Sequence, residues 1–152
     1  DTFNETTLGV LDIKNFNLTK NFTRALTASL WMYQNKRELA KIMLIESIGL
    51  NPEFDKKRLE SVKASCEAME QWFKKFKAHH QVNIPDERIA ALAFQGSFYY
   101  LIIDWLEGNN EKELTASAYA LAVYNLQAIK VPFEDEDIKT YVEELLDELN
   151  SN

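Results

Sequence analysis

The sequence predicts an all-α protein. Apolar residues recur at steps of three and four positions along most of the 152 residues, which places them on one face of a helix. Only four glycines and three prolines interrupt the chain, and no stretch shows the apolar and polar alternation of a half-buried strand. We therefore expect about six helices in one helical domain over 18–152, after an irregular segment over 1–17.

The first two helices follow from spacing and from a clear stop signal. A helix beginning at Leu18 would carry a regular apolar stripe: Leu18, Phe22, Leu26, Leu30 and Tyr33. The polar stretch 34–36 then breaks the pattern. The second helix starts near Arg37 and ends at Gly49, with Pro52 soon after, and this order is typical of a helix C-cap.

The remaining four helices are bounded by polar turns and prolines. A long third helix over 53–80 has apolar residues at helical spacing: Leu59, Val62, Cys66, Met69, Phe73 and Phe76. The fourth begins at 85–87 with acidic residues in its first turn and ends at 108–110. The fifth ends before Pro132, and the sixth, over 134–150, has one apolar side: Ile138, Tyr141, Val142, Leu145 and Leu149.

Charge and composition exclude several classes of function. The net charge of −7 does not suit contact with a phosphate backbone, which requires clustered lysine and arginine. No apolar run reaches the roughly 18 to 20 residues of a membrane span, and no signal peptide is recognisable. A lone cysteine, Cys66, suits a reducing compartment. We expect a soluble cytoplasmic protein, and because Asp1 is not an initiator methionine, a fragment of a longer chain.

Two consecutive helices lack charge on every side, from Ile89 to Ile103 and from Leu114 to Ile129. In the first, apolar residues occupy two opposite faces, whereas a surface helix of a monomer needs only one. We therefore predict a homodimer in which both helices form a four-helix contact. The expected interface residues are Leu92, Gly96, Tyr100, Ile103, Ala118, Leu121 and Asn125. The alternative is a central hairpin surrounded by the other four helices.

Three stretches resemble the regulatory domain of the TetR family of transcriptional regulators. They are RELAKIMLIESIGLNPEF, ERIAALAFQGSFYYLIIDWLEGNN and ELTASAYALAVYNLQAI, and the resemblance covers roughly 18–130. It implies a ligand-binding and dimerisation domain of a repressor whose last two main helices form the dimer contact. The DNA-binding helix-turn-helix domain of that family has no counterpart ahead of Leu18.

The resemblance also implies a pocket for a small apolar or aromatic effector, with no cofactor. Side chains that could line it are Phe22, Leu26, Leu30, Met43, Glu46, Met69, Trp72, Phe73, Phe76, Phe94 and Phe98. The alternative is that the aromatic and methionine side chains simply fill a core. Glu46 shares a face with Leu39, Ile42 and Met43, so burial of that face would require a partner such as Arg24 or Lys41. Otherwise Glu46 lies at the edge.

No catalytic or metal site is expected. His79 and His80 are adjacent and diverge by about 100° on a helix, so they cannot both bind one metal ion. Cys66 has no histidine at helical spacing and is expected to be a buried, inert thiol. Two alternatives to the regulator remain open. One is a free-standing helical interaction protein, and the other is an all-α enzyme acting on an apolar substrate.

Overall fold

The computed structural model describes residues 17–79, 82–108 and 111–152. Within these ranges all regular elements are helical, which confirms the predicted all-α class and the number of about six helices. The chain divides into two compact units, one comprising Asp1–Asn35 and Glu111–Asn152, the other Lys36–Asn110. They are called the α2 unit and the α4–α5 unit, and the helical domain predicted over 18–152 spans both.

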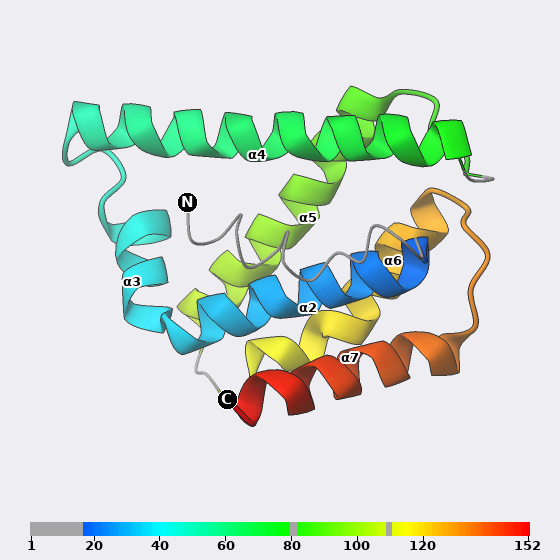
Figure 1. Ribbon diagram of the computed structural model, residues 1–152. Coiled ribbons are helices and arrows are strands. Elements are labelled where there is room, and N and C mark those ends of the chain that lie inside the picture. Colours follow the sequence, from blue (N-terminus) through cyan, green and yellow to red (C-terminus); the bar gives the residue numbers. More distant parts are fainter. Residues whose placement is uncertain (1–16, 80–81, 109–110) are drawn as a thin grey trace. The chain divides into compact units, whose positions relative to one another are not determined.

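Helix α2 (Leu18–Asn35) is the central element of the α2 unit. It packs against α6 (Ala118–Ala128), α7 (Asp135–Asn150) and the 3-10 helix η2 (Leu114–Ser117). Figure 1 shows α2 in blue running beside α7 in red. Lys20 and Asn35 are exposed on one side of α2. Residues around the rest of the helix are buried: Leu18, Asn21, Phe22, Thr23, Ala25, Leu26, Thr27, Ala28, Ser29 and Leu30. The predicted stripe is therefore only part of its buried surface.

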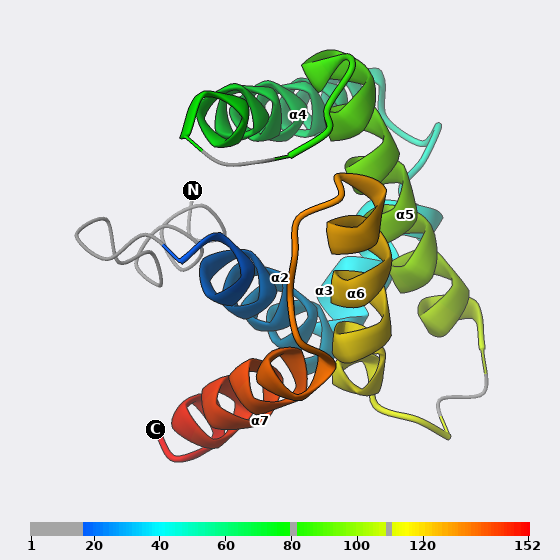
Figure 2. The same ribbon diagram turned by 90° about the vertical axis from the view of Figure 1, so that its right-hand side faces the viewer.

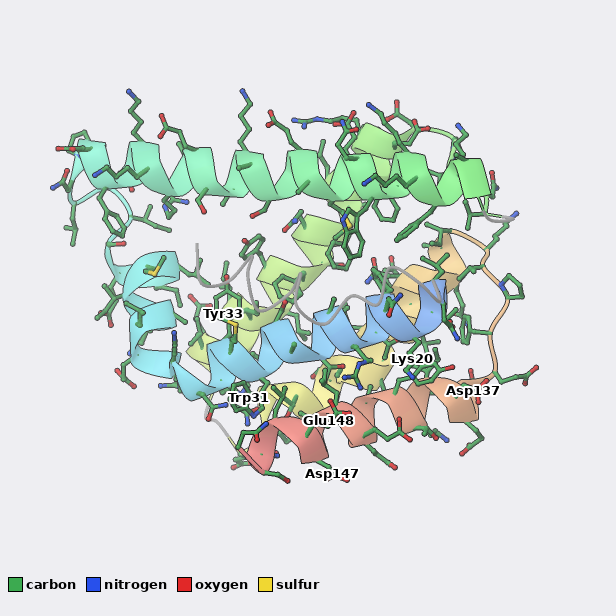
Figure 3. All side chains as sticks on the ribbon, in the orientation of Figure 1. Lys20, Trp31, Tyr33, Asp137, Asp147 and Glu148 are labelled. Atoms are coloured by element: carbon green, nitrogen blue, oxygen red, sulfur yellow. The ribbon has the colours of Figure 1, made fainter. Side chains whose placement is uncertain are left out.

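Polar contacts attach α7 to α2. The two guanidinium Nη atoms of Arg24 donate to the carboxylate of Glu148 at 2.7 and 3.3 Å. The indole Nε1 of Trp31 donates to Asn150 Oδ1 at 3.0 Å. In Figure 3 Trp31 and Glu148 lie between the two helices, whereas Asp147 lies on the far side of α7. The last turn of α7 is thus fixed by side chains from two different turns of α2.

The α4–α5 unit is built on a helical hairpin of α4 (Pro52–His79) and α5 (Glu87–Glu107), which pack on each other. A short helix α3 (Arg37–Lys41) contacts α5 and continues into the π-helical turn η1 (Ile42–Glu46). Figure 2 views α4 nearly along its axis, with α5 running down from it. Cys66, Phe73 and Phe76 of α4 are buried, as their spacing predicts.

Most predicted helix ends lie within a few residues of the observed ones, and three of the ends have a recognisable cap. Asn17 Oδ1 accepts a hydrogen bond from the Lys20 amide at 3.1 Å, and Asp86 Oδ1 accepts one from the Ile89 amide at 2.9 Å. Gly49 adopts a φ of 79°, the left-handed conformation that favours glycine after a helix. Lys130 adopts a φ of 55° after α6. Lys130, two residues before Pro132, thus adopts the left-handed backbone conformation although it is not a glycine.

The second predicted helix differs from a uniform α-helix. The Ser47 amide donates to the carbonyl of Ile42 at 2.9 Å, a step of five residues instead of four. The last turn, Ile42–Glu46, is therefore a π-helix. Periodicity over so short a segment cannot distinguish four-residue from five-residue steps, so the sequence gives no sign of it.

Replacing Arg24 with Gln should weaken the attachment of α7 in a pH-dependent way. The Arg24 guanidinium lowers the pKa of the Glu148 carboxyl below 4.5, so the pair stabilises the fold fully above about pH 5. This contribution is lost as the pH falls below 4.5 through the lowered pKa. Because the Glu148 side chain is 57% exposed, we expect at most about 1 kcal/mol at neutral pH.

Urea unfolding of wild type and Arg24→Gln between pH 3 and pH 7 measures this effect. The two midpoints should differ at pH 7 and converge at the acidic end. Glu148→Gln is the matched control and should reproduce the midpoint of Arg24→Gln at pH 7. A difference that stays constant across the range would show that Arg24 acts through packing instead.

Candidate functional site

Helix α5 presents two apolar faces with opposite environments. One face is buried, with no residue more than 7% exposed: Ala91, Phe94, Phe98, Ile102 and Leu106. The opposite face is open, with Ile89 at 61%, Leu92 at 46% and Tyr100 at 74% exposure. Between Ile89 and Ile103 no charged side chain interrupts either face. The predicted division of this helix into two opposed apolar faces is confirmed.

The residues predicted for the dimer interface lie at different depths. On α5, Leu92, Gly96 and Tyr100 are exposed and Ile103 is half-buried. The predicted residues of the second helix lie deeper: Ala118 is fully buried, and Leu121 and Asn125 are half-buried.

The open face of α6 consists of other residues: Ala116 in η2, then Ala120, Tyr124, Gln127 and Ala128. The prediction misjudged the rotation of this helix because a segment with no charge on any side has no polar face to fix it. Asn125 Nδ2 donates to the carbonyl of Leu121 at 3.0 Å. That part of its amide is therefore used within α6.

The predicted pocket residues are distributed over both units. Phe22, Leu26 and Leu30 are buried in α2. In the α4–α5 unit, Phe73, Phe76, Phe94 and Phe98 are buried, and Met69 and Trp72 are half-buried. Ring centroids lie 5.7 Å apart for Trp72 and Phe76, 6.1 Å for Phe73 and Phe76, and 6.0 Å for Phe94 and Phe98. These are the contacts of aromatic side chains packed in a core.

Met43 and Glu46 are not carried into the interior. Met43 is 41% exposed and Glu46 is exposed, although Ala40, one turn before Met43, is buried. The Glu46 Oε1 lies 3.5 Å from Lys41 Nζ. Of the two positions left open for Glu46, buried or at the edge, the edge position is the one observed, although Glu46 was included among the expected pocket residues. Arg24, the other predicted partner, pairs with Glu148 instead.

Arg37 is an anchoring residue that sequence patterns do not reveal. Its Nη2 donates to the carbonyl of Leu106 at 3.1 Å, and its guanidinium lies 5.4 Å from the centre of the Trp105 ring. The bond satisfies one of the carbonyls left open at the C-terminal end of α5. Arg37 thereby attaches α3 to the last turn of α5.

A shallow open groove crosses the first half of α4, and the sequence gives no sign of it. It is lined by Pro52, Asp55, Lys56, Leu59, Glu60 and Lys63. Asp55 Oδ2 also accepts a hydrogen bond from the Gly49 amide at 3.0 Å, which holds the turn before the helix. Charges of both signs alternate along the groove, so it selects no charged ligand.

Side chains that could bind a metal ion are scattered over the described residues. In the described parts of the chain, no three histidine, cysteine or acidic residues are close enough to hold a metal ion. Cys66 is buried, as predicted. The side chains of His79 and His80 lie outside the described residues.

Helix α5 is also the one described helix that is long and apolar enough to cross a membrane by length and composition. The core helix of a soluble protein passes the same test. Its flanks offer no further sign of a membrane span, because Glu87 and Arg88 at the start and Asp104 near the end are charged.

Comparison with known proteins identifies no relative: no family model, no curated protein and no solved structure matches this chain. The resemblance to TetR regulators therefore depends on the three stretches given above.

Replacing Arg37 with Met should loosen α3 from α5. The change removes a charged hydrogen bond to a half-buried carbonyl and the cation contact with Trp105, so we expect a loss of about 1 to 3 kcal/mol in unfolding free energy. Urea unfolding followed by tryptophan fluorescence measures it. Arg37→Lys keeps the charge but not the planar guanidinium, and should restore less than half of the loss. Unchanged stability of Arg37→Met would contradict the anchoring role.

Proposed function

We propose that the chain is the ligand-responsive dimerisation domain of a TetR-like transcriptional regulator, most simply a repressor. The observation that carries this proposal is the uncharged open face of α5, opposite its buried face. An exposed apolar strip on a long helix marks a site of protein association. In TetR-like regulators the corresponding helix is part of the dimer contact, and the family implies that α6 joins it there.

The charge distribution supports a model in which this domain dimerises and a separate segment binds DNA. Helix α7 alone carries seven carboxylates and a single lysine. Such a surface repels phosphate groups, so DNA would be bound through a separate helix-turn-helix segment. This domain would set the distance between two such segments by holding two subunits together.

Effector control would require two arrangements of the helices with different affinity for the ligand. The aromatic side chains around Phe73, Phe76 and Phe94 supply an apolar lining that an effector could enter by displacing their mutual packing. A ligand of this kind would be small and largely apolar or aromatic, as the resemblance implies.

A second candidate function is that of a helical interaction protein that binds a different protein. It is favoured by a further group of exposed apolar side chains away from α5: Leu39, Ile42, Met43, Ile48 and Leu50. A dimer formed through α5 would leave these residues uncovered. The two candidates differ in whether the chain associates with itself at micromolar concentration.

Native mass spectrometry of the purified chain tests the proposed function. We expect a dimer at about 10 μM, within the affinity range of specific interfaces, and an additional discrete mass per subunit if an effector is retained. A monomer at this concentration would reject dimerisation and favour the interaction protein. Titration of a dimer with 1-naphthol as an aromatic probe, followed by thermal unfolding, then tests the sensor role. An unchanged melting temperature would count against it.

Substitutions on the two faces of α5 should have separable effects. Leu92→Asp places a charge on the open face, so it should convert the dimer to monomer while leaving each chain folded. Ile102→Ala, on the buried face, should lower the unfolding free energy by about 2 to 5 kcal/mol. Sedimentation velocity and circular dichroism measure the two effects. An unchanged dimer for Leu92→Asp would remove the open face of α5 from the contact.

A further inference from the structure

Gly96 lies in the middle of α5, and no contact within its own chain requires a glycine at this position. A glycine inside a helix costs about 1 kcal/mol relative to alanine. A Cβ built on Gly96 would meet no atom within 4 Å, so no neighbouring helix of this chain requires the missing side chain. The backbone there is ordinary α-helix and needs no left-handed conformation. A close approach from outside the chain would explain the residue.

The apolar residues around Gly96 are arranged symmetrically. Leu92 and Tyr100 lie four residues before and after it, and Ile89 and Ile103 lie seven residues before and after it. At 100° per residue all five fall within about 40° of one line along the helix. With a rise of 1.5 Å per residue, the pairs lie about 6 and 10.5 Å from Gly96.

This symmetry is what a twofold contact with a second copy requires. In an antiparallel pair that crosses at Gly96, each residue lies level with the residue at the same distance on the other side of the centre. Leu92 would lie level with the partner subunit's Tyr100, and Ile89 level with the partner subunit's Ile103. Any apolar stripe on a helix repeats at these steps, so the spacing permits this register, and the choice of a second copy depends on the charges at the two ends of the strip.

The distribution of charge also favours a second copy of the chain as the partner of the open face of α5. Two copies of a chain with net charge −7 repel each other, so a self-contact is best made where neither copy presents a charge. The strip from Ile89 to Ile103 is uncharged over about 21 Å. Arg88 and Asp104 lie just beyond its two ends. A positive and a negative group thus flank the strip instead of two acidic groups.

We propose that two copies of the chain pack antiparallel along the open face of α5, with the twofold axis passing beside Gly96. This inference rests on the dimer proposed above and specifies its register. Helix axes separated by 8 to 10 Å bring the two Gly96 Cα atoms to about 3.5 to 5.5 Å, given a Cα radius of 2.3 Å. The side chains of Leu92 and Tyr100 then fill the space on either side of the crossing.

Disulfide trapping tests the register. In a Cys66→Ala background, Gly96→Cys should form an intermolecular disulfide on mild oxidation, because the Cα separation fits disulfide geometry. Tyr100→Cys is the matched control on the same open face. Its two copies would lie about 12 Å apart along the helix and should not crosslink. Leu92→Cys alone should also remain uncrosslinked for the same reason.

A mixture of Leu92→Cys and Tyr100→Cys chains gives a second test that leaves Gly96 intact. These two positions lie level in the proposed register, so the mixed sample should form a crosslinked heterodimer that neither variant forms alone. Intact mass under non-reducing conditions identifies the product, and circular dichroism checks that each variant is folded.

The outcomes separate this inference from the proposed function. Crosslinking of Gly96→Cys and of the mixture, with neither control crosslinked, supports the register. If the wild type is a dimer but neither Gly96→Cys nor the mixture crosslinks, or if Tyr100→Cys alone crosslinks, the register is overturned and the dimer stands. If the wild type is a monomer at the concentration used, both fail together.

Discussion

The burial of one face of α5 is the constraint on which the candidate site depends. Phe94, Phe98 and Ile102 are inaccessible in a unit whose other long helix, α4, packs on α5. Burying several large side chains of this kind contributes roughly 1.5 to 3 kcal/mol each, so the rotation of α5 about its axis is firmly set. Since the helix is apolar all round, fixing one face inward leaves Leu92 and Tyr100 outward. The open face is therefore a consequence of the packing and not of loose structure.

Helix α2 shows a different situation, because it is buried around most of its circumference and several of the buried residues are polar. Thr27 and Ser29 donate to the carbonyls four residues earlier, at 2.7 and 2.9 Å, which satisfies their hydroxyls within the helix. Among the described residues, Asn21 Nδ2 and Thr23 Oγ1 are buried without a hydrogen-bond partner. Each such group costs about 1 to 3 kcal/mol. Neither unit satisfies all of its buried polar groups, because within the described part of the chain the α4–α5 unit also holds such atoms, namely Arg37 Nε, Asp55 Oδ1 and Arg58 Nε.

A feature could be predicted from the sequence where a segment carries a local signal for a helix end or for the faces of a helix. Helix ends near Leu18, Gly49 and Glu87 were predicted within a few residues, because apolar spacing, a glycine stop and acidic residues in the first turn are local signals. The open face of α5 was predicted because both of its opposed faces are apolar, whereas burial within one chain needs only one of them. The rotation of α6 about its axis could not be predicted, because the segment carries no charged residue that would mark its solvent-facing side. The contacts of Arg37 with Leu106 and Trp105 depend on tertiary neighbours and carry no local signal.

The central claim, that α5 is free on one face to receive a second copy, is tested most directly by chemical labelling of Tyr100 at different protein concentrations. Tetranitromethane nitrates accessible tyrosines, and peptide mass analysis reports each position separately. The account predicts that Tyr100, 74% exposed in the single chain, is protected at high concentration and becomes reactive on dilution. Equal reactivity of Tyr100 at all concentrations, in a sample that is dimeric, would contradict the account by placing the contact elsewhere.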